Sequence, residues 1–125
     1  MRWQRAIDAA LRPLGLTHTQ YLVLASAARV IDEQDDAVAQ LAIAEHAGLD
    51  RTTISILIRK LEDRGLFDRD IDGADGRRQR VLLTARGRSI LAKASALVET
   101  AAADTLPQRD LARYPAPRSV GGKRL

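Results

Sequence analysis

The chain has 125 residues, of which 46% are hydrophobic and 29% are charged, so it is long enough for one folded domain and too apolar for a disordered chain. It contains no cysteine and only two histidines, His18 and His46, which excludes disulfides, thiolate metal sites, cysteine nucleophiles and a histidine-rich metal site. The net charge of +4 equals that of residues 51–88 alone, where ten basic residues outnumber six acidic ones, and it favours a polyanionic partner.

No apolar run approaches the roughly 18 residues that a membrane span needs. The first residues, MRWQRAIDAA, lack the apolar segment of a signal peptide. We therefore expect a cytoplasmic protein without a membrane partner. Aromatic residues make up only 3% of the chain, and its alanine-rich runs favour helix over sheet.

The first two predicted elements are helices. Apolar residues at helical spacing predict an amphipathic helix over residues 2–12, which Pro13 ends. The segment LTHTQY then has the spacing of a capping box, in which Thr17 and Gln20 satisfy each other's backbone N–H groups. This second helix is expected to run to about Ile31, and the sequence DEQDD after it reads as an acidic loop.

A helix-turn-helix is predicted next. A short helix over about residues 40–47 is followed by the turn GLD and by a helix over about residues 51–64. Asp50 is a good N-cap for the second of these helices, and Gly65 with Leu66 is placed to form a Schellman end. One buried face is indicated by the spacing of four apolar residues. They are Ile54, Leu57, Ile58 and Leu61.

The segments LFDRD and RQRVLL flank the polar, glycine-containing stretch IDGADGR and predict a β-hairpin, the wing of a winged helix. Thr84 then caps a final helix over about residues 85–105, whose apolar stripe we expect to meet a second subunit. The stripe is Ile90, Leu91, Ala94, Leu97, Val98, Ala101 and Ala102. Pro107 interrupts this helix, and the Pro/Gly-rich basic residues 108–125 predict a disordered tail.

These elements predict a mainly α fold with a small β-hairpin, in a single domain over residues 1–107. The winged helix-turn-helix core would occupy about residues 37–84. The flanking helices, about 2–12 and 85–105, would serve dimerisation.

Three segments of the chain resemble the MarR family of bacterial transcription regulators. They are LGLTHTQYLVL, AEHAGLDRTTISILIRKLEDRGL and DGADGRRQRVLLTARGR, which follow one another at the family's spacing over about residues 11–100. The third contains the Asp-x-Arg pair at Asp75 and Arg77. The resemblance implies a homodimeric winged helix-turn-helix that binds a pseudo-palindromic operator, usually represses, and is often released by a small, commonly phenolic or aromatic, ligand.

The chain departs from the family's pattern in three places. Its first helix is shorter than is usual in the family, and the prolines after residue 106 replace the family's last helix. Both of these departures lie in the dimerisation region, so they bear on the strength of a dimer. Ala39 stands where the family usually has a Ser or Thr cap, which predicts a frayed start of the helix that follows.

The outer face of the helix over residues 51–64 is the main candidate DNA contact, because the second helix of such a motif enters the major groove. Its predicted contacts are Arg51, Thr52, Thr53, Ser55, Ile56, Arg59 and Lys60. Gln40, at the start of the preceding helix, is a further predicted contact. The apolar Ile56 would sit against a thymine methyl group or would simply be a tolerated surface residue. The alternative for the whole face is an ordinary solvated surface.

The wing supplies a second group of candidate DNA contacts. Arg77 at the hairpin tip is suited to the negative potential of the minor groove, and the resemblance implies that Asp75 orients it. Arg78 and Arg80 are placed to reach phosphates. The alternative is a solubilising loop.

Trp3, His18 and Tyr21 lie where the family's ligand crevice would open, and they are candidate contacts for a small aromatic effector. The alternative, that Trp3 and Tyr21 belong to the core or to an interface and that His18 is exposed, is favoured. No set of nucleophile, base and orienting group is visible, so neither an enzyme nor a cofactor is expected. A protein-interaction module, or a shortened regulator that dimerises and binds DNA weakly, stays the alternative function.

Overall fold

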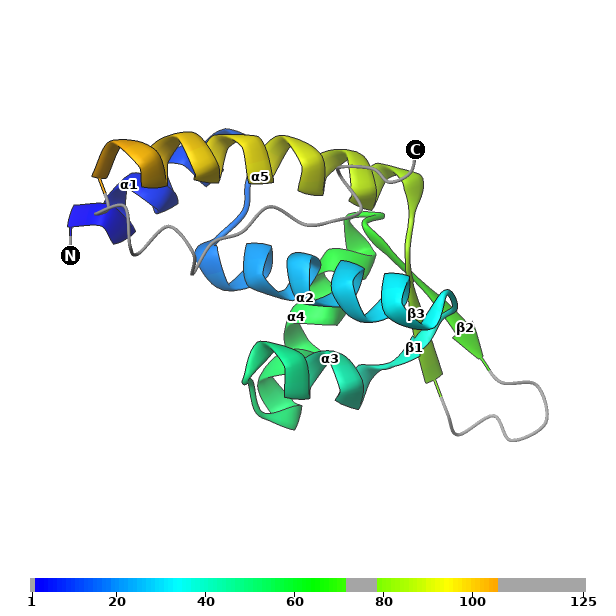
Figure 1. Ribbon diagram of the computed structural model, residues 1–125. Coiled ribbons are helices and arrows are strands. Elements are labelled where there is room, and N and C mark those ends of the chain that lie inside the picture. The colour runs from blue at the N-terminus through cyan, green and yellow to red at the C-terminus, as the bar shows by residue number, and fades with distance from the viewer. Residues whose placement is uncertain (1, 72–78, 106–125) are drawn as a thin grey trace.

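The computed structural model describes residues 2–71 and 79–105. The elements follow one another in the order α1 (Arg2–Leu11), the 3-10 turn η1 (Arg12–Leu14), α2 (His18–Gln34), β1 (Val38–Ala39), α3 (Gln40–Ala47), α4 (Arg51–Asp63), β2 (Phe67–Ile71), β3 (Gln79–Leu83) and α5 (Ala85–Thr105). Figure 1 shows α1 and α5 side by side above α2, with α3 below α2 and the sheet at one end. This arrangement confirms the predicted winged helix-turn-helix.

The predicted helix caps are present. The Thr17 hydroxyl accepts the N–H of Gln20 at 3.1 Å, and the Gln20 side chain accepts the N–H of Thr17 at 3.0 Å. The Thr84 hydroxyl accepts the N–H of Gly87 at 2.9 Å and donates to the carbonyl of Gly65, so it joins the start of α5 to the end of α4. Helix starts were therefore well predicted, because a cap is a local interaction.

Two helix ends differ from the prediction. The helix α1 ends at Leu11, one residue early, and a 3-10 turn that contains Pro13 follows it. The helix α2 continues through the acidic segment to Gln34 and ends at Asp35, whose φ of 55° is left-handed. The prediction of a loop from residue 32 was wrong for residues 32–34, because backbone hydrogen bonding continues the helix to its cap at Asp35, whose N–H donates to the carbonyl of Ile31 at 2.7 Å.

The wing is a three-stranded antiparallel sheet in the order β1-β3-β2, and not a hairpin alone. Val38 of β1 pairs with Val81 of β3, which pairs in turn with Arg69 of β2. The two-residue strand β1 is too short to show an alternating pattern, so the sequence did not reveal it. Ala39 is the N-cap of α3 and offers no side-chain cap, as its identity predicted.

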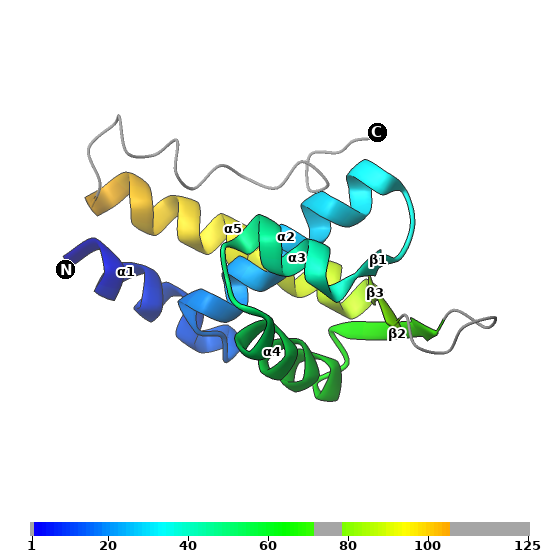
Figure 2. The ribbon, with the colours of Figure 1, turned by 90° about the horizontal axis from the view of Figure 1, so that it is seen from below.

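The apolar stripe of α5 is buried within the chain itself. Leu91, Ala94 and Val98 are at most 1% exposed, and α1 lies along α5 in both ribbon views (Figures 1 and 2). The prediction that this helix has little of its own chain to pack against was wrong, because α1 packs along it and contributes Ile7 and Leu11 to the same buried core. A contact of α5 with a second subunit stays a prediction. Leu97, at the edge of the stripe, remains 38% exposed.

Among the described residues no helix is long and apolar enough to cross a membrane. The predicted disordered tail, and with it Asp75, Arg77 and Arg78 of the wing, lies outside the described residues.

Candidate nucleic-acid interface

The helix α4 separates an apolar inner face from a polar outer face. Ile54, Ile58 and Leu61 are fully buried. Five predicted contacts are exposed, namely Arg51, Thr52, Ile56, Arg59 and Lys60, and the other two, Thr53 and Ser55, are half-buried. Figure 2, the view from below, shows α4 at the front of the molecule beside α3. No other helix or strand lies in front of α4 in this view.

The cations of this face are not neutralised locally. Within the described ranges no carboxylate forms an ion pair with Arg51, Arg59 or Lys60, whereas other arginines of the same segment have partners. Arg88 pairs with Asp32 at 3.1 Å, for example. Unpaired cations on one exposed helix face create a positive potential that attracts a polyanion.

The N-terminal end of α4 is fixed by its cap. The Asp50 carboxylate accepts the N–H of Thr53 at 3.1 Å, and hydrogen bonding from the side chain and backbone of Thr53 lowers the pKa of Asp50. The charged carboxylate also complements the positive end of the helix dipole. This cap orients the first turn of α4, from which base contacts are made in helix-turn-helix proteins.

The C-terminal end of α4 is held to the turn between α1 and α2. The N–H of Leu66 donates to the carbonyl of Leu61 at 3.0 Å, which completes the predicted Schellman motif. The Arg64 guanidinium donates to the carbonyls of Leu14 and Gly15 at 2.8 and 2.9 Å. Gly15 has a φ of 69°, a left-handed conformation that glycine adopts without the strain that a residue with a Cβ atom would have. Arg64 thereby joins the end of α4 to the turn between α1 and α2.

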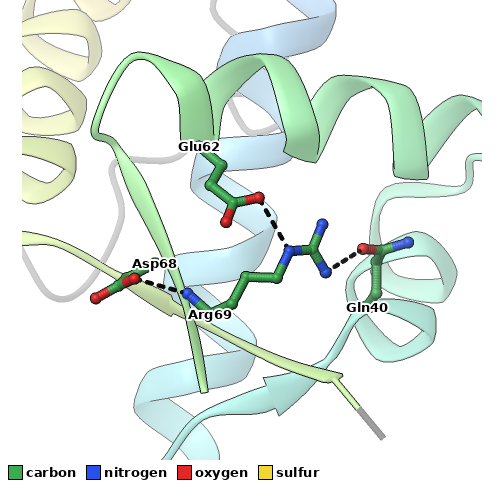
Figure 3. Close-up of polar contacts among 4 residues, drawn as sticks. All are labelled: Gln40, Glu62, Asp68 and Arg69. Atoms are coloured by element: carbon green, nitrogen blue, oxygen red, sulfur yellow. Dashed lines mark hydrogen bonds and ion pairs between the residues drawn. The ribbon is translucent and has the colours of Figure 1, made fainter. Parts of the chain in front are cut away.

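A second arginine links α3, α4 and the sheet. The Arg69 side chain donates from Nε to Glu62 at 2.9 Å and from Nη1 to the amide oxygen of Gln40 at 3.1 Å (Figure 3). Gln40, a predicted DNA contact, is the first residue of α3 and is half-buried. Neither Arg64 nor Arg69 was predicted from the sequence to have a role. The strand period of two could have indicated Arg69, because it places Arg69 on the same side of β2 as the buried Phe67.

Of the predicted wing contacts, the structure describes the side chain of Arg80 alone. Its Nη1 lies 3.7 Å from the carboxylate of Asp36, and the two side chains are 38% and 67% exposed. An ion pair this long and this exposed is weak, so it leaves Arg80 able to exchange Asp36 for a phosphate.

The candidate ligand residues differ in burial and in their partners. Tyr21 is buried, and its hydroxyl lies 3.5 Å from that of Ser95 on α5. Burial and, to a smaller extent, the nearby Glu99 raise the pKa of Tyr21, against the lowering effect of Ser95. His18 is the half-buried first residue of α2, and Trp3 lies in α1 with its side chain outside the described part. Among the described residues no cluster of His, Asp and Glu could hold a metal ion.

A surface hollow of about 350 Å³ lies where α1 meets α2. It is lined by Asp8, Arg12, Gly15, Leu16 and Thr17, and so includes neither His18 nor Tyr21. Because Gly15 also accepts a hydrogen bond from Arg64, this hollow adjoins the connection to α4.

Comparison with known proteins places this geometry in context. The model of the MarR family matches residues 16–78 of the chain. The HTH-type transcriptional repressor Rv2887 of Mycobacterium tuberculosis is 35% identical over 119 residues, which cover 95% of this chain and 78% of that protein. The resemblance seen in the three sequence segments is therefore confirmed.

Solved structures agree in fold. CouR from Rhodococcus jostii RHA1 bound to p-coumaroyl-CoA superposes with a TM-score of 0.70 at 32% identity, and the match covers 90% of this chain and 78% of that one. MosR from M. tuberculosis in complex with DNA superposes with a TM-score of 0.67 at 32% identity, over 90% and 80% of the two chains. Rv2887 is a transcriptional repressor and MosR is a transcriptional regulator, so the family is one of regulators and not of enzymes.

Proposed function

Because the chain belongs to the MarR family and is a DNA-binding transcriptional repressor, we propose that it binds its operator as a homodimer through the outer face of α4. The observation that carries this proposal is the set of exposed, locally unpaired cations on α4, Arg51, Arg59 and Lys60, interleaved with short hydroxyl side chains. Arginine forks onto guanine or grips phosphate, and Thr and Ser hydroxyls adapt to either donors or acceptors on base edges.

The wing and the flanking helices complete the proposed assembly. Arg77 would enter the minor groove, oriented by Asp75, while Arg78 and Arg80 would reach phosphates. In a single domain of residues 1–107, the helices about 2–12 and 85–105 would join two copies, so that their α4 helices lie in successive major grooves about 34–36 Å apart. A repressor that binds operator DNA would act in the bacterial cytoplasm.

A small ligand would release the operator. CouR, which is 32% identical to this chain, binds p-coumaroyl-CoA, and the candidate contacts here are Trp3, His18 and Tyr21. Thr17, which precedes His18, lines the hollow at the α1–α2 junction. The connection from this junction to α4 through Arg64 supports such a role. A ligand would release DNA only by binding better to a dimer whose two α4 helices are wrongly spaced.

The proposal is tested by selecting duplexes from a random pool and measuring the affinity of two matched variants for the selected sequence. Lys60→Ala on α4 and Lys93→Ala on α5 remove the same charge from two exposed positions. We expect Lys60→Ala to weaken binding about three- to tenfold, as loss of one phosphate contact does, and Lys93→Ala to change it less than twofold.

Two outcomes would contradict the proposal. Equal losses for the two variants would show that overall charge, and not the α4 face, attracts DNA. A chain that retains no duplex from the pool, while its dimer mass is normal, would favour the protein-interaction module instead.

A further inference from the structure

Arg69 occupies the side of the wing sheet that faces the helices. It is paired across the sheet with Val81, which is paired with Val38, and residues directly opposite one another project to the same face. Val81 and Val38 are 0% and 1% exposed, so this is the core-facing side. A guanidinium placed there is costly unless its N–H groups are paired. Its partners are therefore part of what keeps this residue in place.

Two of those partners belong to two different helices. Nε donates to Glu62 in the last turn of α4, and Nη1 donates to the Gln40 side chain at the start of α3, while the Arg69 side chain is only 19% exposed. Arginine has donors and no acceptor, so the atom of Gln40 that faces it must be the amide oxygen. Figure 3 shows the result, in which the amide nitrogen of Gln40 points away from Arg69.

We infer that Arg69 is a positioning residue for DNA binding, which holds the start of α3 to the end of α4 and turns the Gln40 amide group so that its N–H donors face a DNA phosphate. The inference rests on the proposed function, in which Gln40 is a DNA contact. Glutamine side chains are common phosphate donors, and the first helix of a helix-turn-helix crosses the DNA backbone. Arg69 itself stays within the protein, with its charge balanced by Glu62.

A double-mutant cycle tests whether Arg69 acts through Gln40. The probe is a labelled duplex that the wild-type chain has selected from a random pool, and the variants are Arg69→Met, Gln40→Met and the double variant. We expect each single variant to bind about three- to tenfold more weakly, the effect of one hydrogen bond. The double variant should be no weaker than the worse single variant. Losses that multiply would overturn the inference.

Salt dependence separates positioning from direct contact. A residue that neutralises a phosphate contributes about 0.9 to the slope of log affinity against log salt concentration. Arg69→Met should therefore give a line parallel to that of the wild type, whereas Arg59→Met on the outer face should give a flatter one. A slope reduced by Arg69→Met as much as by Arg59→Met would show that Arg69 touches DNA and would overturn the inference.

Gln40→Glu keeps the inference testable even if Arg69→Met does not fold. The carboxylate still accepts from Arg69, so the melting temperature should stay or rise, but the outward donor is lost and affinity should fall at least as far as in Gln40→Met. Unchanged affinity would overturn the inference. A wild-type chain that binds no duplex would overturn the proposed function and the inference together, whereas multiplying losses on a bound duplex overturn the inference alone.

Discussion

The helices α4 and α5 have similar apolar spacing, yet they differ in what covers their two faces. Three inward residues of α4 are fully buried and its outer face carries unpaired cations, whereas the stripe of α5 is covered by α1 and α2. Ala94 and Ala102 on that stripe are small enough for a close approach of helices. We therefore expect substitutions in the stripe of α5 to change mainly stability and substitutions on the outer face of α4 to change mainly DNA binding.

The largest expected effect is on the stability that α5 provides. Leu91→Ala removes a side chain that is 1% exposed, and the cavity left behind should lower the free energy of unfolding by about 2–5 kcal/mol. Leu97→Ala, on the same helix but 38% exposed, is the matched control and should cost less than about 1 kcal/mol. Urea unfolding measures both. Similar losses would show that the buried stripe does not dominate the packing of α5.

The connection of α4 to the turn between α1 and α2 should have the next largest effect. Arg64→Met removes two charge-assisted hydrogen bonds to the carbonyls of Leu14 and Gly15, and we expect a loss of about 1–3 kcal/mol in the free energy of unfolding. Arg59→Met on the outer face of α4 should cost under about 0.5 kcal/mol and should weaken DNA binding. If both variants unfold at the same urea concentration, Arg64 does not hold α4 in place.

A smaller effect is expected inside the helical part. Tyr21→Phe removes the 3.5 Å contact with Ser95 and should lower the free energy of unfolding by about 0.5–1.5 kcal/mol. Because the pKa of Tyr21 is raised above its ordinary value of 10.0, the wild-type stability that this group contributes is complete below pH 10 and declines as pH rises through the folded-state pKa. Thermal melts across this alkaline range should show less decline for Tyr21→Phe, and parallel declines would contradict the account.

The smallest change in stability is expected at Ile56, which is 52% exposed. Ile56→Ser should leave the melting temperature within about 2 °C, because surface substitutions change stability little. Its effect should be on sequence preference, since an apolar side chain in the major groove contacts a thymine methyl group. Affinity should fall for duplexes with thymine beneath this position. An equal loss on all duplexes would make Ile56 an ordinary surface residue.

The features that were predicted correctly depend on local sequence. The capping box at Thr17 and Gln20, the N-cap Asp50 and the Schellman end at Gly65 are formed by residues a few positions apart. The exposed face of α4 followed from helical period in the same way. The helix-turn-helix and the exposure of the main candidate contacts could therefore be predicted from residues that are close together in the sequence.

The features that were missed depend on contacts between distant segments. Arg64 reaches carbonyls 49 and 50 positions away, and Arg69 reaches Gln40 across 29 positions. The strand β1 exists because Val38 meets Val81, and α5 is covered because α1 folds back along it. No periodicity in the sequence encodes these pairs, so neither the orientation of Gln40 nor the connection from α4 to the α1–α2 turn could be foreseen.

The absence of cysteine from the chain allows the comparison of the two helices to be tested directly. Ile56→Cys on α4 and Leu97→Cys on α5 each create a unique attachment point for a photo-crosslinker at an exposed position. With the selected duplex, the account predicts crosslinking to DNA from Ile56→Cys and none above background from Leu97→Cys. Crosslinking from Leu97→Cys alone, or equally from both, would contradict the claim that the outer face of α4 binds DNA.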